Sequence, residues 1–162
     1  MAAEPTYEPI ATTTLGSATS AVTFSNISGS YTDLVLVDQA FGVASHYFVR
    51  LNSDSGSNYS VNVILAVSGS ALADRSSNQT SGQISRSADS SNSPMGITHF
   101  MKYSATDSWK TILSKGNVGN SIVIQYVNLW RSTSAITSIE LRPASGNFDT
   151  GSIFTLYGIK AA

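Results

Sequence analysis

The sequence predicts an all-β protein, a jelly-roll-like antiparallel β-sandwich of about ten strands with a short extended N-terminal arm. Along most of the 162 residues, short runs of β-branched and aromatic residues alternate with Gly, Ser and Asn turns. No stretch keeps apolar residues at the i, i+3, i+4 spacing of a helix. The 29 Ser and 15 Thr residues suit exposed strand faces and turns, and they serve helix interiors poorly. A lipocalin-type barrel is the alternative fold.

The chain divides into an extended arm, residues 1–9, and a single sandwich domain, residues 10–162. Pro5 and Pro9 favour extended backbone before them, which predicts the arm. The predicted strands of the domain are Ile10–Leu15, Ala21–Ile27, Asp33–Val37, His46–Asn52, Tyr59–Val67, Met95–Tyr103, Trp109–Ser114, Ser121–Trp130, Ile136–Arg142 and Ser152–Ile159. Residues 68–93 are mostly Ser, Asn, Gly and Ala, so we expect a long polar loop outside the core. This loop could hold at most one weak strand, near Asn78–Ser85.

Two of the predicted strands are apolar on both faces. Leu34–Val37 is aliphatic throughout, and Ser121–Val127 carries apolar residues on both of its faces. Such runs are typical of central strands that are covered on both sides. Ile136–Arg142 instead alternates, with Ile139 and Leu141 on one face, which predicts one covered and one exposed face.

Charge is sparse and excludes several classes of partner. The formal net charge is −1, and charged residues make up 12% of the chain, whereas an average domain has about 25%. Lys and Arg are scattered, so we expect no nucleic-acid partner and no polybasic membrane contact. The N-terminus lacks the basic and apolar regions of a secretory signal, and no run reaches the ~20 apolar residues of a membrane helix. We therefore expect a protein that stays where it is made, or that leaves as part of an assembly or by cell lysis.

The stretch LNSDSGSNYS, residues 51–60, resembles a calcium loop because oxygen-bearing side chains alternate along it. An EF-hand loop requires Gly at position 6 and a bidentate Glu at position 12, where this chain has Ser57 and Val63. Only Asp54 supplies a full negative charge. The stretch is therefore better explained as the turn between two strands.

The sequence shows no catalytic motif. The chain has no Cys, which excludes disulfides, thiolate metal sites and a Cys nucleophile. Its two His residues, His46 and His99, lie in predicted strands, and no G-x-S-x-G elbow is present. Nearly all the acidic residues lie in loops or at strand ends. We expect a protein that is not an enzyme, with no catalytic residue, cofactor or metal site.

Aromatic residues leave saccharide binding open. An exposed aromatic platform with nearby amides is a common way for a jelly roll to bind sugar. The candidates for such a platform are Tyr31, Tyr47, Tyr59, Tyr103 and Trp130. Aromatic residues on strands belong more often to the core or to an interface.

Several segments together resemble a family of small virion structural proteins encoded by tailed bacteriophages. The segments that carry the resemblance are Tyr7–Leu15 (YEPIATTTL), Ile27–Leu34, Gly56–Ser60, Leu129–Ile139, Ser145–Phe148 and Gly151–Lys160. The resemblance covers nearly the whole chain and is weakest over 68–93. It implies a β-sandwich without catalysis that forms homo-oligomers, commonly trimers. Similar domains occur both alone and at the ends of tail-fibre proteins.

The resemblance also gives the last predicted strand a role. Phe154 and Leu156 share one face of this strand, and the opposite face is also largely apolar. We expect the first face to fill the sandwich and the second to meet a neighbouring subunit. Gly158 is expected to admit close approach of another backbone.

We therefore predict a capsid decoration protein, which sits on the exterior of the virion shell after assembly in the host cytoplasm and binds the major capsid protein. A single small domain without a coiled-coil shaft favours this role, and the arm could add extended backbone to a capsid-protein strand edge. The alternative is a tail-fibre tip or receptor-binding module that recognises host polysaccharide. The candidate partner-binding residues are Glu4, Pro5, Tyr7, Pro9, Tyr157 and Ile159.

Overall fold

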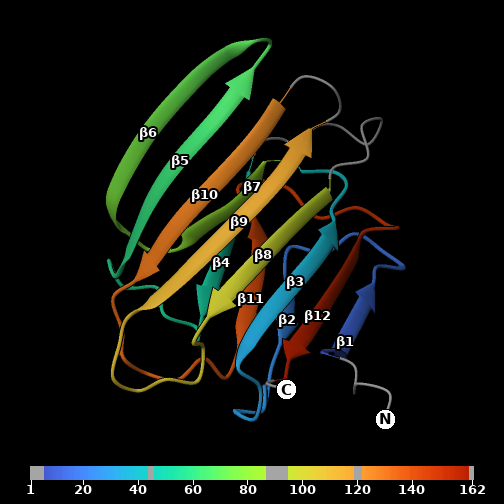
Figure 1. Ribbon diagram of the computed structural model, residues 1–162. Coiled ribbons are helices and arrows are strands. Elements are labelled where there is room, and N and C mark those ends of the chain that lie inside the picture. The colour runs from blue at the N-terminus through green and yellow to red at the C-terminus, as the bar shows by residue number, and fades with distance from the viewer. Residues whose placement is uncertain (1–5, 44–45, 87–94, 119–121, 161–162) are drawn as a thin grey trace.

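The computed structural model describes residues 6–43, 46–86, 95–118 and 122–160, and it confirms the jelly-roll-like antiparallel β-sandwich (Figure 1). These residues form twelve strands and no helix, so none of them belongs to a helix that could span a membrane. The strands are β1 (Tyr7–Thr14), β2 (Val22–Phe24), β3 (Asp33–Gln39), β4 (His46–Leu51), β5 (Tyr59–Val67), β6 (Ser70–Gln79), β7 (Gly82–Arg86), β8 (Met95–Met101), β9 (Lys110–Val118), β10 (Ile122–Trp130), β11 (Ile139–Pro143) and β12 (Ile153–Ile159).

The strands form two sheets that pack face to face. The larger sheet has eight strands in the order β1-β12-β3-β8-β9-β10-β5-β6, and the smaller has four in the order β2-β11-β4-β7. In Figure 1 the four-stranded sheet lies behind the central strands of the larger sheet, and the β5–β6 hairpin extends beyond it. Each sheet therefore has an inner face, which meets the core, and an outer face, which points away from the other sheet.

Side chains from the two inner faces fill the core. Phe154 and Leu156 of β12 are fully buried there, as their predicted face requires. Phe148, in the turn that leads into β12, packs its ring 5.7 Å from that of Tyr47 and 4.9 Å from that of Phe154. Gly146, in the same turn, has a φ of 70°, a conformation that glycine adopts without steric cost. The S-G-N-F turn thus contributes a ring to the core as well as a change of direction.

A buried amide joins the two sheets. Asn128 of β10 is 0% exposed, and its Oδ1 accepts a hydrogen bond of 2.8 Å from the backbone N–H of Gln83 in β7. Its Nδ2 donates to the backbone carbonyl of the same residue, also at 2.8 Å. The side chain thereby pairs with β7 as a strand backbone would, and every polar atom of the amide has a partner.

The structure corrects the long polar loop predicted over residues 68–93. β6 pairs with β5 along nearly its whole length, although almost all of its side chains are exposed, and β7 pairs with β4. Backbone hydrogen bonds to an apolar partner strand are sufficient to form β6, so its sequence needs no apolar alternation. Residues 87–93, the rest of the predicted loop, lie outside the described residues.

The structure also corrects the predicted arm, because residues 7–9 belong to a strand. Tyr7, Glu8 and Pro9 are the first residues of β1 and pair with β12, so the edge of the sheet begins inside the predicted arm. Residues 1–5 lie outside the described residues. A clamp onto another protein would therefore have to come from the residues that precede β1.

Two further predictions, the cover of two strands on both faces and a close approach at Gly158, are confirmed only in part. Val35 on β3 is 1% exposed although it lies on the outer face, so this strand is covered on both sides as predicted. On β10, however, Val123 is 67% exposed, so the prediction of double cover is wrong there. Gly158 does admit a close approach, but by a side chain: a Cβ at this position would lie 2.3 Å from the Tyr31 ring.

Candidate interaction surface

The outer face of the eight-stranded sheet carries most of the exposed apolar side chains. The cross-strand register assigns alternate residues of every strand to this face, for example Val37, Ile97 and Lys115 in one row across β3, β8 and β9. The row continues through Gln125 of β10 to Ile64 of β5. Because paired residues in an antiparallel sheet point to the same side, each such row lies on one surface.

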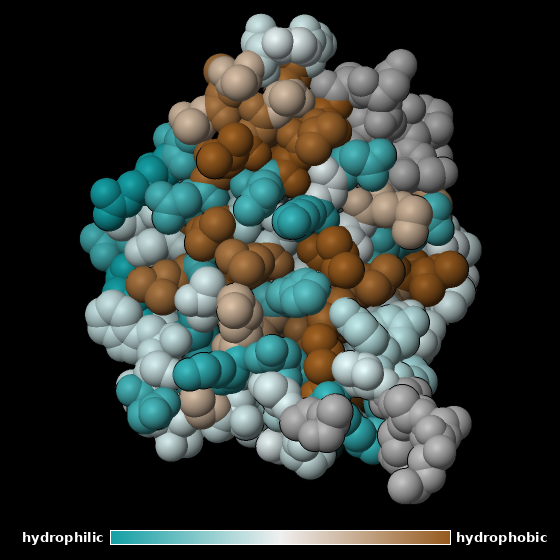
Figure 2. All heavy atoms as spheres, in the orientation of Figure 1, coloured by the Kyte–Doolittle hydropathy of each residue, from teal (hydrophilic) through white to brown (hydrophobic). Residues whose placement is uncertain are grey.

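Ten large hydrophobic side chains are exposed in the described part of the chain, and eight of them lie on this outer face. A ninth, Trp109, comes two residues before Thr111, which lies on the same face. We call these nine the apolar face; they are Tyr7, Ile64, Met95, Ile97, Met101, Trp109, Val123, Val127 and Ile153. The tenth, Leu72, pairs with Leu65 and lies on the opposite side of the β5–β6 hairpin. Figure 2 views the molecule from this side and shows hydrophobic side chains from the top of the sheet to its middle.

Two hollows at the centre of the apolar face are bordered by little charge, and a further hollow beside Ile64 is bordered by Asp74 and Arg75. One hollow of about 250 Å³ is lined by Ile97, His99, Leu113 and Lys115. A second, of about 280 Å³, lies over β5, β9 and β10 beside Ile64 and Val123. Lys115 borders both hollows, so a partner that fills them would meet one cation within an apolar surround.

The structure brings four of the six predicted partner residues together. Tyr7 and Pro9 of β1 pair with Ile159 and Tyr157 of β12, and all four lie on the outer face at one side of the sheet. The rings of Tyr7 and Tyr157 meet edge to face with centroids 6.2 Å apart. Glu4 and Pro5 lie outside the described residues.

The turn over residues 51–60 is organised by hydrogen bonds to Asp54. The Asp54 carboxylate accepts hydrogen bonds from the Trp130 Nε1–H at 2.6 Å, the Gly56 backbone N–H at 2.8 Å and the Asn58 amide at 3.0 Å. Partial burial works against its ionisation, but these hydrogen bonds outweigh burial and hold the Asp54 pKa below its ordinary value. The described residues contain no cluster of three or more His, Cys, Asp or Glu that could hold a metal ion.

The sugar platform considered from the sequence is not formed by the aromatics that suggested it. Tyr47, Tyr59, Tyr103 and Trp130 are all buried in the core, and Tyr31 packs against it. The two histidines lie on opposite outer faces, because His46 belongs to the four-stranded sheet and His99 to the eight-stranded sheet. The two therefore cannot share a ligand.

Most of the apolar face was missed at the sequence level. Met95, Ile97 and Met101 alternate along β8, but alternation alone does not say which face a second sheet covers. One signal was present in the sequence: the segment that forms β10 is apolar on both of its faces. The four-stranded sheet covers only one of these faces, so the other requires a further partner.

Comparisons with known proteins add little to this description. No protein-family model matches the sequence, and no curated protein matches it. The exo-inulinase of Aspergillus awamori aligns with a TM-score of 0.42 and 10% identity over 94% of this chain and 29% of the inulinase chain. The Caenorhabditis elegans galectin LEC-6 aligns with a TM-score of 0.36 and 12% identity over 90% of this chain and 94% of the galectin. Likeness at this level carries no argument about function.

Proposed function

We propose that the protein is a non-catalytic capsid decoration protein of a tailed bacteriophage, which binds the exterior of the shell through its apolar face. The observation that carries this proposal is the concentration of exposed apolar side chains on one outer face of one sheet. The resemblance of the sequence to small virion proteins supports the identity of the assembly.

The energetics of the apolar face favour a permanent protein partner. Burial of apolar surface stabilises an interface by roughly 25 cal/mol for each Å² removed from water. Contiguous exposed apolar patches on soluble domains usually mark interaction sites, and the buried centres of interfaces are depleted in charge. Lys115 is the one formal charge that borders the two central hollows of this face, so covering them would desolvate few charged groups.

Two partners share this face in the proposal. The major capsid protein covers the central part, around Ile97, Val123 and Ile64, where the hollows lie. Further copies of the chain meet at the β1–β12 side, where Tyr7 and Tyr157 form an aromatic ridge, and complete a homotrimer. Both contacts use surface that is already formed in the single chain.

The decisive experiment is the copy number of the protein per virion, measured by quantitative mass spectrometry of purified particles against the major capsid protein. Icosahedral symmetry places a decoration protein at on the order of hundreds of copies, whereas tail symmetry limits a fibre to roughly tens or fewer. Hundreds of copies support the proposal. Tens or fewer would transfer the protein to the tail and favour the receptor-binding alternative. Its absence from particles would contradict both.

A further inference from the structure

The four-stranded sheet has a pocket on its own outer face, on the opposite side of the sandwich from the apolar face. The pocket has a volume of about 350 Å³ and is formed by β4, by the end of β11 and by the turn between β6 and β7. We call it the arginine pocket; its lining residues are Phe48, Arg50, Gln79, Thr80, Ser81, Arg142, Pro143 and Ala144. Its size is in the range of small-molecule sites, about 300–1,000 Å³.

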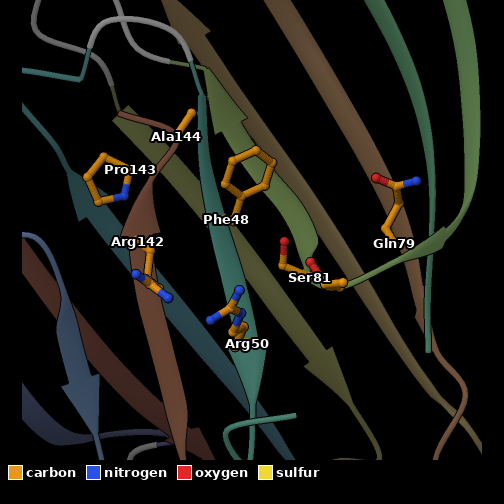
Figure 3. Close-up of a pocket in the computed structure, with 8 residues that line it drawn as sticks. Phe48, Arg50, Gln79, Ser81, Arg142, Pro143 and Ala144 are labelled. Atoms are coloured by element: carbon orange, nitrogen blue, oxygen red, sulfur yellow. The ribbon is translucent and has the colours of Figure 1, made fainter. Parts of the chain in front are cut away.

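Register explains why these residues meet. Phe48 and Arg50 alternate on the outward side of β4, and Phe48 pairs with Arg142 of β11 on one side and with Gln83 of β7 on the other. In Figure 3, Arg142 and Gln79 lie at opposite ends of the pocket, with Phe48, Arg50 and Ser81 between them. Two guanidinium groups thus flank one aromatic ring, with hydroxyl and amide groups beyond it.

The pocket has an excess of one positive charge. Arg142 forms an ion pair with Glu140, with 3.3 Å between Nε and Oε1. Arg50 makes no ion pair or side-chain hydrogen bond within the described ranges, although Glu140 is its direct cross-strand neighbour. A half-buried guanidinium with five unpaired donors favours an acceptor that binds two of them at once, as a carboxylate does.

The other end of the pocket offers uncharged hydrogen-bonding groups. The hydroxyls of Thr80 and Ser81 make no hydrogen bond to any part of the chain that the structure describes. Gln79 donates its Nε2–H to the Ser77 carbonyl at 2.9 Å, which leaves its Oε1 as an acceptor. These groups match ligand hydroxyls, and the Phe48 ring with Pro143 supplies an apolar surface between the two ends.

We propose that the arginine pocket binds a carboxylate on a hydroxylated ring, the chemistry of a uronic acid residue of an acidic polysaccharide. The single negative charge of a carboxylate balances the excess charge of the pocket, whereas a phosphate dianion would overcompensate it. The ring packs on Phe48, and its hydroxyls reach Ser81, Thr80 and Gln79. The site lies on the side of the sandwich opposite the apolar face, so both can be occupied at once whether the protein lies on a shell or on a tail.

The test is a titration of the purified full-length protein, followed by calorimetry and by amide NMR shifts. The probes are free galacturonate, an oligogalacturonate, the methyl ester of galacturonate and inorganic phosphate. We expect both acids to bind and to shift amides of β4 and β11, and the ester to bind at least about tenfold more weakly because it lacks the charge. Tighter oligogalacturonate binding identifies a polysaccharide as the source, and equal binding identifies a free sugar acid.

Variants tie binding to the pocket. Arg50→Gln is expected to weaken galacturonate binding about tenfold or more, and Phe48→Leu is expected to weaken it as well. Arg75→Gln removes the same charge from an exposed position of β6, away from the pocket, and should change nothing. Melting temperatures confirm that each variant is folded. The proposal is overturned by equal binding to wild type and Arg50→Gln, by equal binding of acid and ester, by tighter binding of phosphate, or by no binding of either acid at roughly 10 mM.

Discussion

The outer face of the eight-stranded sheet exposes Met95, Ile97 and Val123, whereas that of the four-stranded sheet presents Arg50, Arg142 and Glu140. Both faces belong to the same small domain and are built from equally regular antiparallel strands. The first has two central apolar hollows bordered by a single lysine, and the second has a polar pocket with two guanidinium groups. The average composition of the chain, nearly neutral and rich in hydroxyls, hides this division.

In the proposed assembly, the two faces should differ in how far they are exposed to water. An apolar face is stabilised by cover, whereas charged groups lose hydration when they are covered and need matched partners in return. We therefore expect the larger sheet to face the particle and the smaller one to face solvent. Each of the following changes breaks or sharpens this contrast, from the largest expected effect to the smallest.

A lysine in the centre of the apolar face should have the largest effect. Val123→Lys would bury an unpaired ammonium in the proposed interface, and such a charge costs about 3–5 kcal/mol. We expect binding to particles that lack the protein to weaken by more than a hundredfold, measured by co-sedimentation. Thr23→Lys, on the outer face of the other sheet and opposite Glu140, is the matched control and should bind as wild type does. Equal loss in both variants would contradict the division of roles.

The buried carboxyl of Asp38 should make stability depend on pH. Asp38 lies between the sheets, where it accepts a hydrogen bond from the Tyr47 hydroxyl. Burial raises the Asp38 pKa to about 6, and the Tyr47 hydrogen bond only partly offsets it. A carboxyl with a raised folded-state pKa contributes fully below its unfolded pKa, and this contribution is lost as the pH rises through 6.

We therefore expect the free energy of unfolding to fall by on the order of 3 kcal/mol between pH 4 and pH 7, measured by urea denaturation. Asp38→Asn removes the titrating group and should flatten this part of the profile. Equal slopes for wild type and Asp38→Asn over this range would contradict a raised Asp38 pKa.

Removal of the Asn128 amide that joins the sheets should lower the free energy of unfolding by somewhat less than ionisation of Asp38 does. Asn128→Ala leaves the buried backbone N–H and carbonyl of Gln83 without their partners, which we expect to destabilise the fold by about 2 kcal/mol. Chemical denaturation measures the change. Asn62→Ala, at an exposed position of β5, should stay within about 0.5 kcal/mol of wild type. Similar values for the two variants would mean that Asn128 does not hold the sheets together.

Loss of the Asp54 carboxylate should have the smallest effect. Asp54→Ala removes three hydrogen bonds in a partly exposed turn, so we expect a loss of about 1 kcal/mol in thermal or chemical unfolding. Because the folded pKa of Asp54 is lowered, its contribution should disappear at acid pH, as the pH falls through that pKa. Addition of calcium or EDTA should leave the melting temperature of wild type unchanged. A rise with calcium would restore the metal-site interpretation of this turn.

Much of the fold follows from local patterns. Ten predicted strands coincide with ten of the twelve described strands, because β-branched runs and turn residues act over short distances. β6 was the main failure, since its residues 70–79 are polar and exposed, and only pairing with β5 makes them a strand. The aromatic candidates failed for a related reason: Tyr59 and Trp130 alternate correctly, but their faces turn toward the core.

The candidate sites depend on contacts that a sequence does not display. Phe48, Arg142 and Ser81 come from three separate segments, and only the order β11-β4-β7 brings them to one pocket. The apolar face likewise depends on which strands lie beyond the reach of the smaller sheet. Tyr7 and Tyr157 were predicted as partner residues from the resemblance, and the β1–β12 pairing places them in contact.

The outermost strands of the larger sheet bear on how the protein behaves before it meets a particle. Pro9 has no N–H, and the pairing of β1 with β12 shifts register between Pro9 and Ala11, so a further strand cannot continue the ladder there without interruption. At the other margin, β6 carries the adjacent charges of Asp74 and Arg75, which discourage lateral pairing. Sideways polymerisation into fibrils is thereby opposed at both margins. In the proposed function, the apolar face is then covered by closed assembly on the particle rather than by growth of an open fibril.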